Sequence, residues 1–102
     1  MNPMNPDGEA NNWLSCITLA KDCGVTPQVI METLAKENIE TRPIWKPMHL
    51  QPVFAECDYV KAPGSDADVS ADIFARGVCL PSDIKNTDEE MRQIIDLIRG
   101  LF

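Results

Sequence analysis

The clearest hydrophobic pattern in the chain predicts an amphipathic helix over residues 87–102, TDEEMRQIIDLIRGLF. Thr87 and Glu90 have the spacing of a capping box, in which each side chain bonds the backbone N–H of the other. Acidic residues fill the first turn, where the positive end of the helix dipole favours them. Apolar residues then recur at helical spacing, and we expect this stripe to face a core: Met91, Ile94, Ile95 and Ile98.

A second helix is predicted over residues 26–38. Thr26 can cap it, and the next residue is a proline, which suits the first helical position because the missing N–H costs nothing there. Its apolar face consists of Val29, Ile30 and Leu34. Asn38 tolerates the left-handed conformation that ends many helices.

Shorter patterns predict the remaining elements. A short helix is expected over 70–77, with Ser70 as its cap and Gly77 as its end. Partly alternating or apolar runs predict strands over 13–20 and 78–82. The segments between are expected to form a flexible lead-in (1–11), an extended stretch (39–54) and an acidic surface loop (55–69).

This order of elements indicates an α+β fold over residues 12–102. The strands are too few and too short for a doubly wound sheet, so we expect a two-layer domain in which helices cover a small sheet. A chain of 102 residues is one domain's worth of sequence.

Cysteine and histidine usage argues against a metal site. The four cysteines form no CxxC pair, and the single histidine cannot complete a familiar zinc pattern. Cys16 and Cys79 sit in apolar runs and are expected to be small core residues. Asp66 and Asp68 resemble the start of a calcium loop, but the loop glycine and the final glutamate are missing.

Charge and hydropathy narrow the range of partners. The formal net charge of −7 argues against non-specific nucleic-acid binding, which needs basic surface. No apolar run approaches the roughly 20 residues that cross a bilayer, so no membrane partner is expected. The first residues lack the basic and apolar regions of a signal peptide, and a cytoplasmic location is the expectation.

The segment RPIWKPMHLQPVF (42–54) is the most unusual in the chain. Arg42 and Lys46 each precede a proline, which pushes them toward extended conformations and stiffens the backbone. Trp45 and His49 add an aromatic surface and a titratable group. Such a segment could hold a ligand, but it could equally cross a domain edge with its tryptophan in a core. His49 has no acidic neighbour in sequence, and Lys46 has no neighbour that would make it a nucleophile.

Three blocks together resemble a known family. NIETRPIWKPMHLQPVF, ADIFARGVCLPS and NTDEEMRQIIDLI follow one another as in the C-terminal region of the DegT/StrS family, and NNWLSCITL resembles the strand that begins that region. These are pyridoxal-phosphate-dependent aminotransferases of fold type I that act on nucleotide-linked keto sugars. The resemblance runs from about residue 11 to residue 102. The RPIWKPMHLQP block is most similar to enzymes of the bacillosamine type, which transfer an amino group from glutamate to a UDP-linked 4-keto sugar.

The resemblance implies that a large N-terminal domain is missing from this sequence. In the family that domain holds the cofactor, supplies its lysine and builds most of the homodimer. The five lysines here match no cofactor-lysine motif: Lys21, Lys36, Lys46, Lys61 and Lys85. We therefore expect no catalytic residue and no cofactor binding in this chain, and no transamination by the chain alone.

The resemblance also implies which residues meet the substrate. Trp45 would face the nucleotide-sugar, with His49 and Lys46 near it, and Arg42 would suit a carboxylate or the diphosphate. Two alternatives stay open: a free-standing interaction module, or a structural remnant without a ligand. A domain cut from its partner should associate through exposed apolar residues, for which the candidates are Trp13, Trp45, Met48, Phe54, Leu101 and Phe102.

Overall fold

The computed structural model describes residues 6–11 and 13–102. Two segments with a single 3-10 turn each, η1 and η2, accompany the helices and strands. In chain order the elements are β1 (Ser15–Thr18), α1 (Pro27–Lys36), β2 (Arg42–Pro43), η1 (Met48–Leu50), η2 (Pro52–Phe54), α2 (Val69–Arg76), β3 (Gly77–Leu80) and α3 (Asp88–Arg99). The predicted α+β class with a small sheet and covering helices is confirmed.

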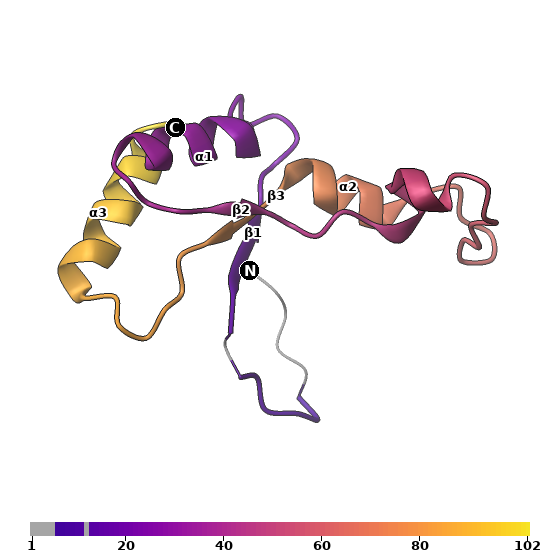
Figure 1. Ribbon diagram of the computed structural model, residues 1–102, viewed down its shortest axis with the longest axis horizontal. Coiled ribbons are helices and arrows are strands. Elements are labelled where there is room, and N and C mark those ends of the chain that lie inside the picture. Colours follow the sequence, from indigo (N-terminus) through magenta and orange to yellow (C-terminus); the bar gives the residue numbers. More distant parts are fainter. Residues whose placement is uncertain (1–5, 12) are drawn as a thin grey trace.

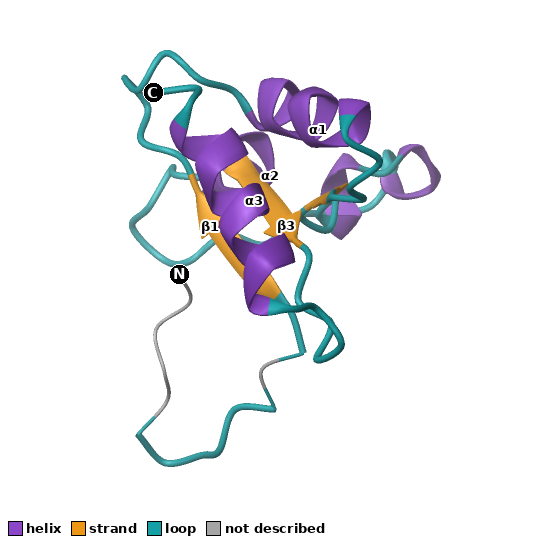
Figure 2. Ribbon diagram, turned by 90° about the vertical axis from the view of Figure 1, so that its left-hand side faces the viewer, coloured by secondary structure: helices purple, strands orange, loops and turns teal. Residues whose placement is uncertain are grey.

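The sheet has three antiparallel strands in the order β1-β3-β2. Cys79 in the central strand pairs with Cys16 on one side and with Arg42 on the other. Helices α1 and α3 pack against one another and lie over one face of the sheet (Figures 1 and 2). Neither α1 nor α3 therefore covers the opposite face of the sheet, which carries the Cys16–Cys79 pair.

The core lies between that sheet face and the two helices. Its buried residues come from β3, α1, α3 and the turn after β1: Val78, Ile30, Leu34, Ile94 and Leu19. The apolar faces predicted for α1 and α3 are confirmed at their centres, which are buried. They are wrong at their edges, where Val29 is 40% exposed and Ile95 is 42% exposed. Successive helical residues are turned by about 100°, so a side chain one position from a fully buried residue points toward the helix edge.

The predicted caps of the two long helices are confirmed. The Thr26 hydroxyl accepts the Val29 N–H at 3.3 Å, and Thr87 and Glu90 form the reciprocal capping box. The Glu90 carboxylate accepts the Thr87 N–H at 2.7 Å, and this bond is the main reason that the pKa of Glu90 is lowered. Asn38 takes a left-handed conformation with φ 58°, as expected for a residue just past a helix end.

The predicted cap of the short helix is wrong. Asp68, rather than Ser70, caps α2, and its carboxylate accepts the Ala71 N–H at 2.9 Å. A charged carboxylate is the stronger acceptor at the positive end of a helix, so the helix begins earlier than expected. Ser70 donates its hydroxyl proton to the same carboxylate at 2.9 Å. Gly77 ends the helix as predicted and also begins β3.

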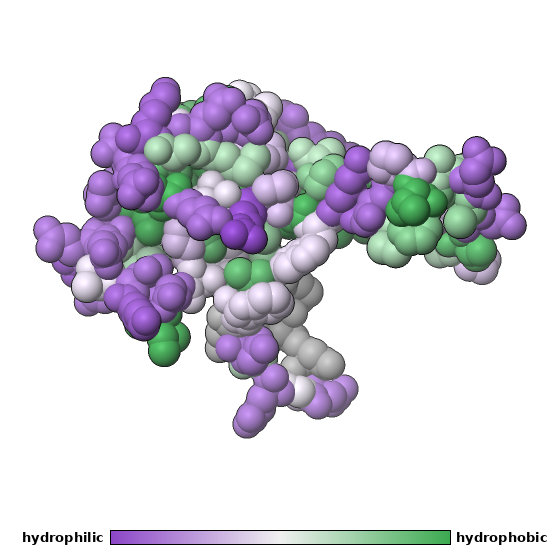
Figure 3. Space-filling view, viewed as in Figure 1, coloured by the Kyte–Doolittle hydropathy of each residue, from purple (hydrophilic) through white to green (hydrophobic). Residues whose placement is uncertain are grey.

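Residues 46–76, which we call the arm, extend away from the body (Figure 1). The expectation of an extended chain over 39–54 is wrong in its second half, where η1 and η2 form. The ring of Pro52 fixes a φ that a 3-10 turn accepts, and the Phe54 N–H bonds the Gln51 carbonyl at 2.9 Å. Hydrophobic residues gather at the surface of the arm (Figure 3).

Part of the predicted lead-in, residues 1–5, and the predicted domain start at residue 12 lie outside the described residues. Residues 6–11 are exposed and form a turn but neither helix nor strand. No helix in the described part of the chain combines the length and the apolar content that crossing a bilayer would require.

Candidate functional site

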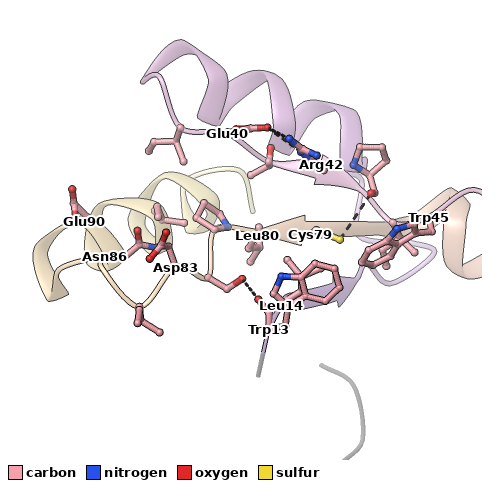
Figure 4. A pocket seen from close by; sticks show the side chains of 18 of the residues that line it. Trp13, Leu14, Glu40, Arg42, Trp45, Cys79, Leu80, Asp83, Asn86 and Glu90 are labelled. Atoms are coloured by element: carbon pink, nitrogen blue, oxygen red, sulfur yellow. Dashed lines mark hydrogen bonds and ion pairs between the residues drawn. The ribbon is translucent and has the colours of Figure 1, made fainter. Parts of the chain in front are cut away.

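A broad groove of about 1480 Å³ lies beside the end of the sheet. It is bordered by the segment entering β1, the segment around β2, the residues after β3 and the start of α3 (Figure 4). The antiparallel register brings these segments together although they are far apart in sequence. Hydrophobic and aromatic side chains occupy one end in the close-up view, and polar side chains occupy the other.

Trp13 and Trp45 form the aromatic end of the groove. Their ring centroids are 6.1 Å apart and their planes are inclined by 50°. The rings are largely open to solvent, with Trp13 69% and Trp45 62% exposed, so neither side chain fills a core. The Ser82 hydroxyl donates to the Trp13 carbonyl at 3.0 Å and fixes the chain there. Exposed aromatic faces of this kind can stack on a planar or apolar ligand surface.

Two basic side chains border the groove, and they differ in their surroundings. Arg42 is held by Glu40, whose carboxylate accepts its Nη2–H at 2.7 Å and its Nε–H at 2.9 Å. Both partners are well exposed, so the pair is weak and an incoming anion could replace the carboxylate. The Lys46 ammonium group has no side-chain partner among the described residues and is open to solvent.

Carboxylates outnumber basic groups along the groove. Its lining includes four acidic residues against the two basic ones: Glu37, Glu40, Asp83 and Glu90. Asp83 and Glu90 lie at the end far from the tryptophans (Figure 4). An anionic group is therefore favoured near Arg42 and Lys46, whereas the far end suits hydrogen-bond donors such as hydroxyl or amino groups.

The structure does not place His49 in this groove. His49 lies on the arm, where its Nε2 is 2.6 Å from the Asp68 carboxylate and its ring stacks on Tyr59 with centroids 3.7 Å apart. Of the four predicted substrate-facing residues, the groove therefore brings together Arg42, Trp45 and Lys46. His49 can reach a ligand only from the arm.

Cys79 contributes to the groove from the central strand. Its Sγ lies 3.4 Å from the Sγ of Cys16, and both thiols are free. Burial is the main reason that the pKa of the Cys79 thiol is raised to about 11, and the contact with Cys16 adds to it. Cys79 is buried as expected, whereas Cys16 is only partly buried.

No cluster of three or more candidate metal ligands is present among the residues that the structure describes. Asp68, which with Asp66 resembles only the start of a calcium loop, caps α2 and contacts His49.

Three residues of these sites were not among the predicted ones. Trp13 was expected only as part of an apolar patch, although it is the first residue of the segment 13–20 that the sequence predicts as a strand. Glu40 stands two residues before Arg42 in an extended segment, a spacing that puts both side chains on one face. The contact between His49 and Asp68 joins positions 19 residues apart and left no local signal.

Comparison with known proteins identifies the family and the fold of this chain. A model of the DegT/DnrJ/EryC1/StrS aminotransferase family matches residues 1–99. The EpsN protein of Bacillus subtilis (strain 168), named as a pyridoxal phosphate-dependent aminotransferase, is 41% identical over 95 residues, which are 93% of this chain and 24% of EpsN. The crystal structure of a DegT DnrJ EryC1 StrS aminotransferase from Brucella abortus matches with a TM-score of 0.68 and 26% identity, over 86% of this chain and 22% of that one.

The chain thus spans about a quarter of the length of either relative. The matched fold is the small antiparallel sheet with its helices. On the family match and the fold together, this chain belongs to the DegT/DnrJ/EryC1/StrS aminotransferase family.

Proposed function

We propose that residues 12–102 are the C-terminal small domain of an aminotransferase that acts on a nucleotide-linked 4-keto sugar, with glutamate as the amino donor. In this proposal the chain binds and orients the substrate and does not transaminate alone. The observation that supports this proposal is the groove in this chain, where an exposed tryptophan pair lies beside two basic side chains.

Each group of the groove matches a part of such a substrate. Trp45 and Trp13 offer faces for a base or for the apolar face of a sugar ring. Lys46 and Arg42 can attract the diphosphate, and Arg42 alternatively fits the carboxylate of glutamate in a two-bonded arrangement. The carboxylates at the far end can accept hydrogen bonds from sugar hydroxyls.

The described residues do not fit pyridoxal phosphate, the cofactor named for EpsN. A cofactor lysine needs a sheltered site beside the reacting atoms. Here Lys21 pairs with Asp72 and Lys61 bonds the Asp66 carbonyl. The remaining lysines, Lys36, Lys46 and Lys85, are exposed. We therefore place the cofactor on an N-terminal domain that corresponds to the part of the relatives that this chain does not span. In this proposal that domain is the partner of the chain. It also forms most of the homodimer interface.

His49 has a different place in the proposal. Its imidazole is ordered by Asp68 and Tyr59 on the arm, outside the groove. It would meet the substrate only where the arm contacts another part of a longer protein. We expect such a protein to work in the cytoplasm, where nucleotide sugars are made.

Binding of ligand fragments to the chain tests this proposal. We would titrate UDP-N-acetylglucosamine, UDP and N-acetylglucosamine separately and follow tryptophan fluorescence and backbone NMR shifts. We expect the nucleotide sugar to bind most tightly and to shift the signals of Trp13, Trp45 and Arg42. A Trp45→Ala variant should weaken binding about tenfold, since stacking on one aromatic ring contributes about 1–3 kcal/mol.

The matched control is Val60→Ala, which removes an exposed apolar side chain on the arm, outside the groove. Equal loss of binding in both variants, or no binding of any of the three ligands, would count against the groove as the substrate site. Measured transaminase activity of the chain with added pyridoxal phosphate would contradict the division of roles.

A further inference from the structure

Two free thiols, one of them on a residue that lines the groove, lie close enough to react with one another. Cys16 and Cys79 stand directly opposite on β1 and β3, and their sulfur atoms are 3.4 Å apart. Both are on the sheet face away from α1 and α3, because the neighbouring Val78 points into the core. The proposed function uses neither thiol.

The hydrogen-bond pattern of the strand pair gives this position the favourable geometry. The Leu19 N–H bonds the Arg76 carbonyl at 2.9 Å, so the Leu19–Arg76 pair is a hydrogen-bonded one. Hydrogen-bonded and non-hydrogen-bonded pairs alternate along an antiparallel ladder. Counting back three pairs from Leu19, Cys16 and Cys79 form a non-hydrogen-bonded pair, in which the Cα atoms approach to about 4.5 Å. That separation is within the range that a disulfide spans.

We propose that Cys16 and Cys79 form a reversible disulfide when the protein meets a hydroperoxide. This site goes beyond the proposed function and does not depend on it. It would place an oxidisable bond across β1 and β3, with one of the two sulfur atoms, that of Cys79, on a residue that lines the groove.

The two thiols have different roles in the reaction. Cys16 is the more exposed sulfur, while burial keeps the Cys79 thiol protonated at neutral pH through its raised pKa. A dissolved hydroperoxide therefore reaches Cys16 first. Its sulfur attacks the hydroperoxide, the O–O bond breaks, and a sulfenic acid forms on Cys16 as the released alkoxide takes the thiol proton and leaves as an alcohol.

The second step closes the bond. The Cys79 sulfur attacks the Cys16 sulfur, the S–O bond breaks, and the departing hydroxide takes the Cys79 proton to form water. The two thiols together lose two electrons and two protons. An organic hydroperoxide is thereby reduced to one alcohol and one water, and hydrogen peroxide to two waters. A dithiol reductant reverses the change by thiol–disulfide exchange.

The other two cysteines are placed differently and provide controls. The Cys23 thiol donates to the Val25 carbonyl at 3.3 Å in the turn before α1. Cys57 is exposed on the arm. Neither has a cysteine partner recorded in the described structure, so oxidation at these positions should give oxygen adducts or links between molecules.

Peptide mapping after mild oxidation tests the proposal. The folded chain would be treated with hydrogen peroxide, alkylated and digested with trypsin under non-reducing conditions. We expect residues 1–21 and 77–85 to be joined, the intact chain to lose two hydrogens, and two of the four thiols to become inaccessible to alkylation. Dithiothreitol should restore them. A Cys23→Ser, Cys57→Ser double variant should give the same linked peptide, because it keeps the pair.

Two comparisons show whether the fold produces this bond. In urea the preference for the Cys16–Cys79 link should disappear, since nothing then holds the two strands together. A Cys16→Ser variant should lose the link while circular dichroism shows an unchanged fold. The proposal is overturned if the folded chain oxidises at Cys57 while Cys16 and Cys79 both remain open to alkylation after unfolding, or if they carry only separate oxygen adducts.

Discussion

The Nε2 atom of His49 lies 2.6 Å from Oδ2 of Asp68, and this contact joins η1 to the first turn of α2. The other carboxylate oxygen accepts the Ala71 N–H and the Ser70 hydroxyl. Tyr59 stacks on the imidazole and donates its hydroxyl proton to the same carboxylate at 3.3 Å. One carboxylate therefore holds three separate segments of the arm, which has no buried hydrophobic core of its own.

The stability of the arm should fall in acid because of Asp68. The Ala71 N–H, helped by Ser70 and His49, lowers the pKa of Asp68 from 3.8 to about 2. A carboxyl whose pKa is lower in the folded state stabilises the fold above its unfolded pKa, and that stability is lost as the pH falls through the folded value. We expect α2 signals in NMR spectra to weaken between pH 4 and pH 2.

An Asp68→Asn variant should lose part of this acid dependence, because amide side chains do not titrate in this range. Asp72 in the same helix also has its pKa lowered to about 2, mainly by Arg76, so some dependence should remain. Identical acid profiles of the variant and the parent would contradict the role given to Asp68.

Arg76 should stabilise the junction between α2 and the sheet. Its guanidinium binds the Asp72 carboxylate, with Nη2–H donating at 2.5 Å, and also donates to the Leu19 carbonyl. An Arg76→Ala variant removes this donor from the Leu19 carbonyl and leaves the Asp72 carboxylate with only its exposed Lys21 pair, and we expect it to lower the free energy of unfolding by about 1–3 kcal/mol. Urea denaturation measures this. Lys21→Ala is the control, since it removes only an exposed ion pair to the same carboxylate and should cost less than about 1 kcal/mol.

Gly77 should tolerate no larger residue. A Cβ there would lie 2.1 Å from Cδ1 of Ile44 and 2.7 Å from the Ile73 carbonyl oxygen. Because one of these neighbours is backbone, Gly77→Ala should lower the free energy of unfolding by about 1–3 kcal/mol. Gly100→Ala is the matched control: its nearest neighbour, the Asp96 carbonyl, is 3.4 Å away, so the change should be small. Equal urea midpoints for the two variants would refute the close packing at Gly77.

The exposed apolar side chains should make the chain associate. Several large ones lie on the arm, in the groove or at the C-terminus: Met48, Val53, Trp13, Trp45 and Phe102. Burying such surface in a second copy is favourable by roughly 25 cal/mol per Å². We expect light scattering at high concentration to show dimers or larger species, and Val53→Asp to reduce them. A sharp monomer peak at every concentration would show that these exposed apolar side chains do not cause association.

Local signals predicted the parts of the fold that are determined locally. The capping box of α3, the Thr26 cap of α1 and the left-handed Asn38 all follow from side chains within a few residues of the groups they bond. Burial was predicted less well at the helix edges, because it depends on how α1 and α3 rotate against the sheet. That rotation is set by the packing of the whole core.

The site was predictable in part for the same reason. The proline-rich segment marked Arg42, Trp45 and Lys46, which do border one groove. The groove itself depends on β1 and β2 flanking β3, a pairing between distant segments that brings Trp13 to Trp45. His49 lies on the arm, in the first of the two 3-10 turns. The residue pattern did not predict these turns.

Releasing Arg42 from Glu40 should strengthen anion binding in the groove. The carboxylate accepts two N–H groups of the guanidinium, and a diphosphate must displace it to bind there. Since an exposed ion pair contributes about 0.2–1 kcal/mol, we expect Glu40→Gln to tighten UDP binding by a factor of about 1.4 to 5 in calorimetric titrations. Arg42→Gln should weaken it.

Glu56→Gln distinguishes this local effect from a change in overall charge. It also removes one negative charge, but Glu56 is exposed on the arm and does not line the groove. An equal gain of affinity in both variants would mean that the net charge of −7, rather than the Glu40–Arg42 pair, opposes the anion. A gain confined to Glu40→Gln, and shrinking as salt screens the exposed charges, would establish Arg42 as the group that the diphosphate contacts.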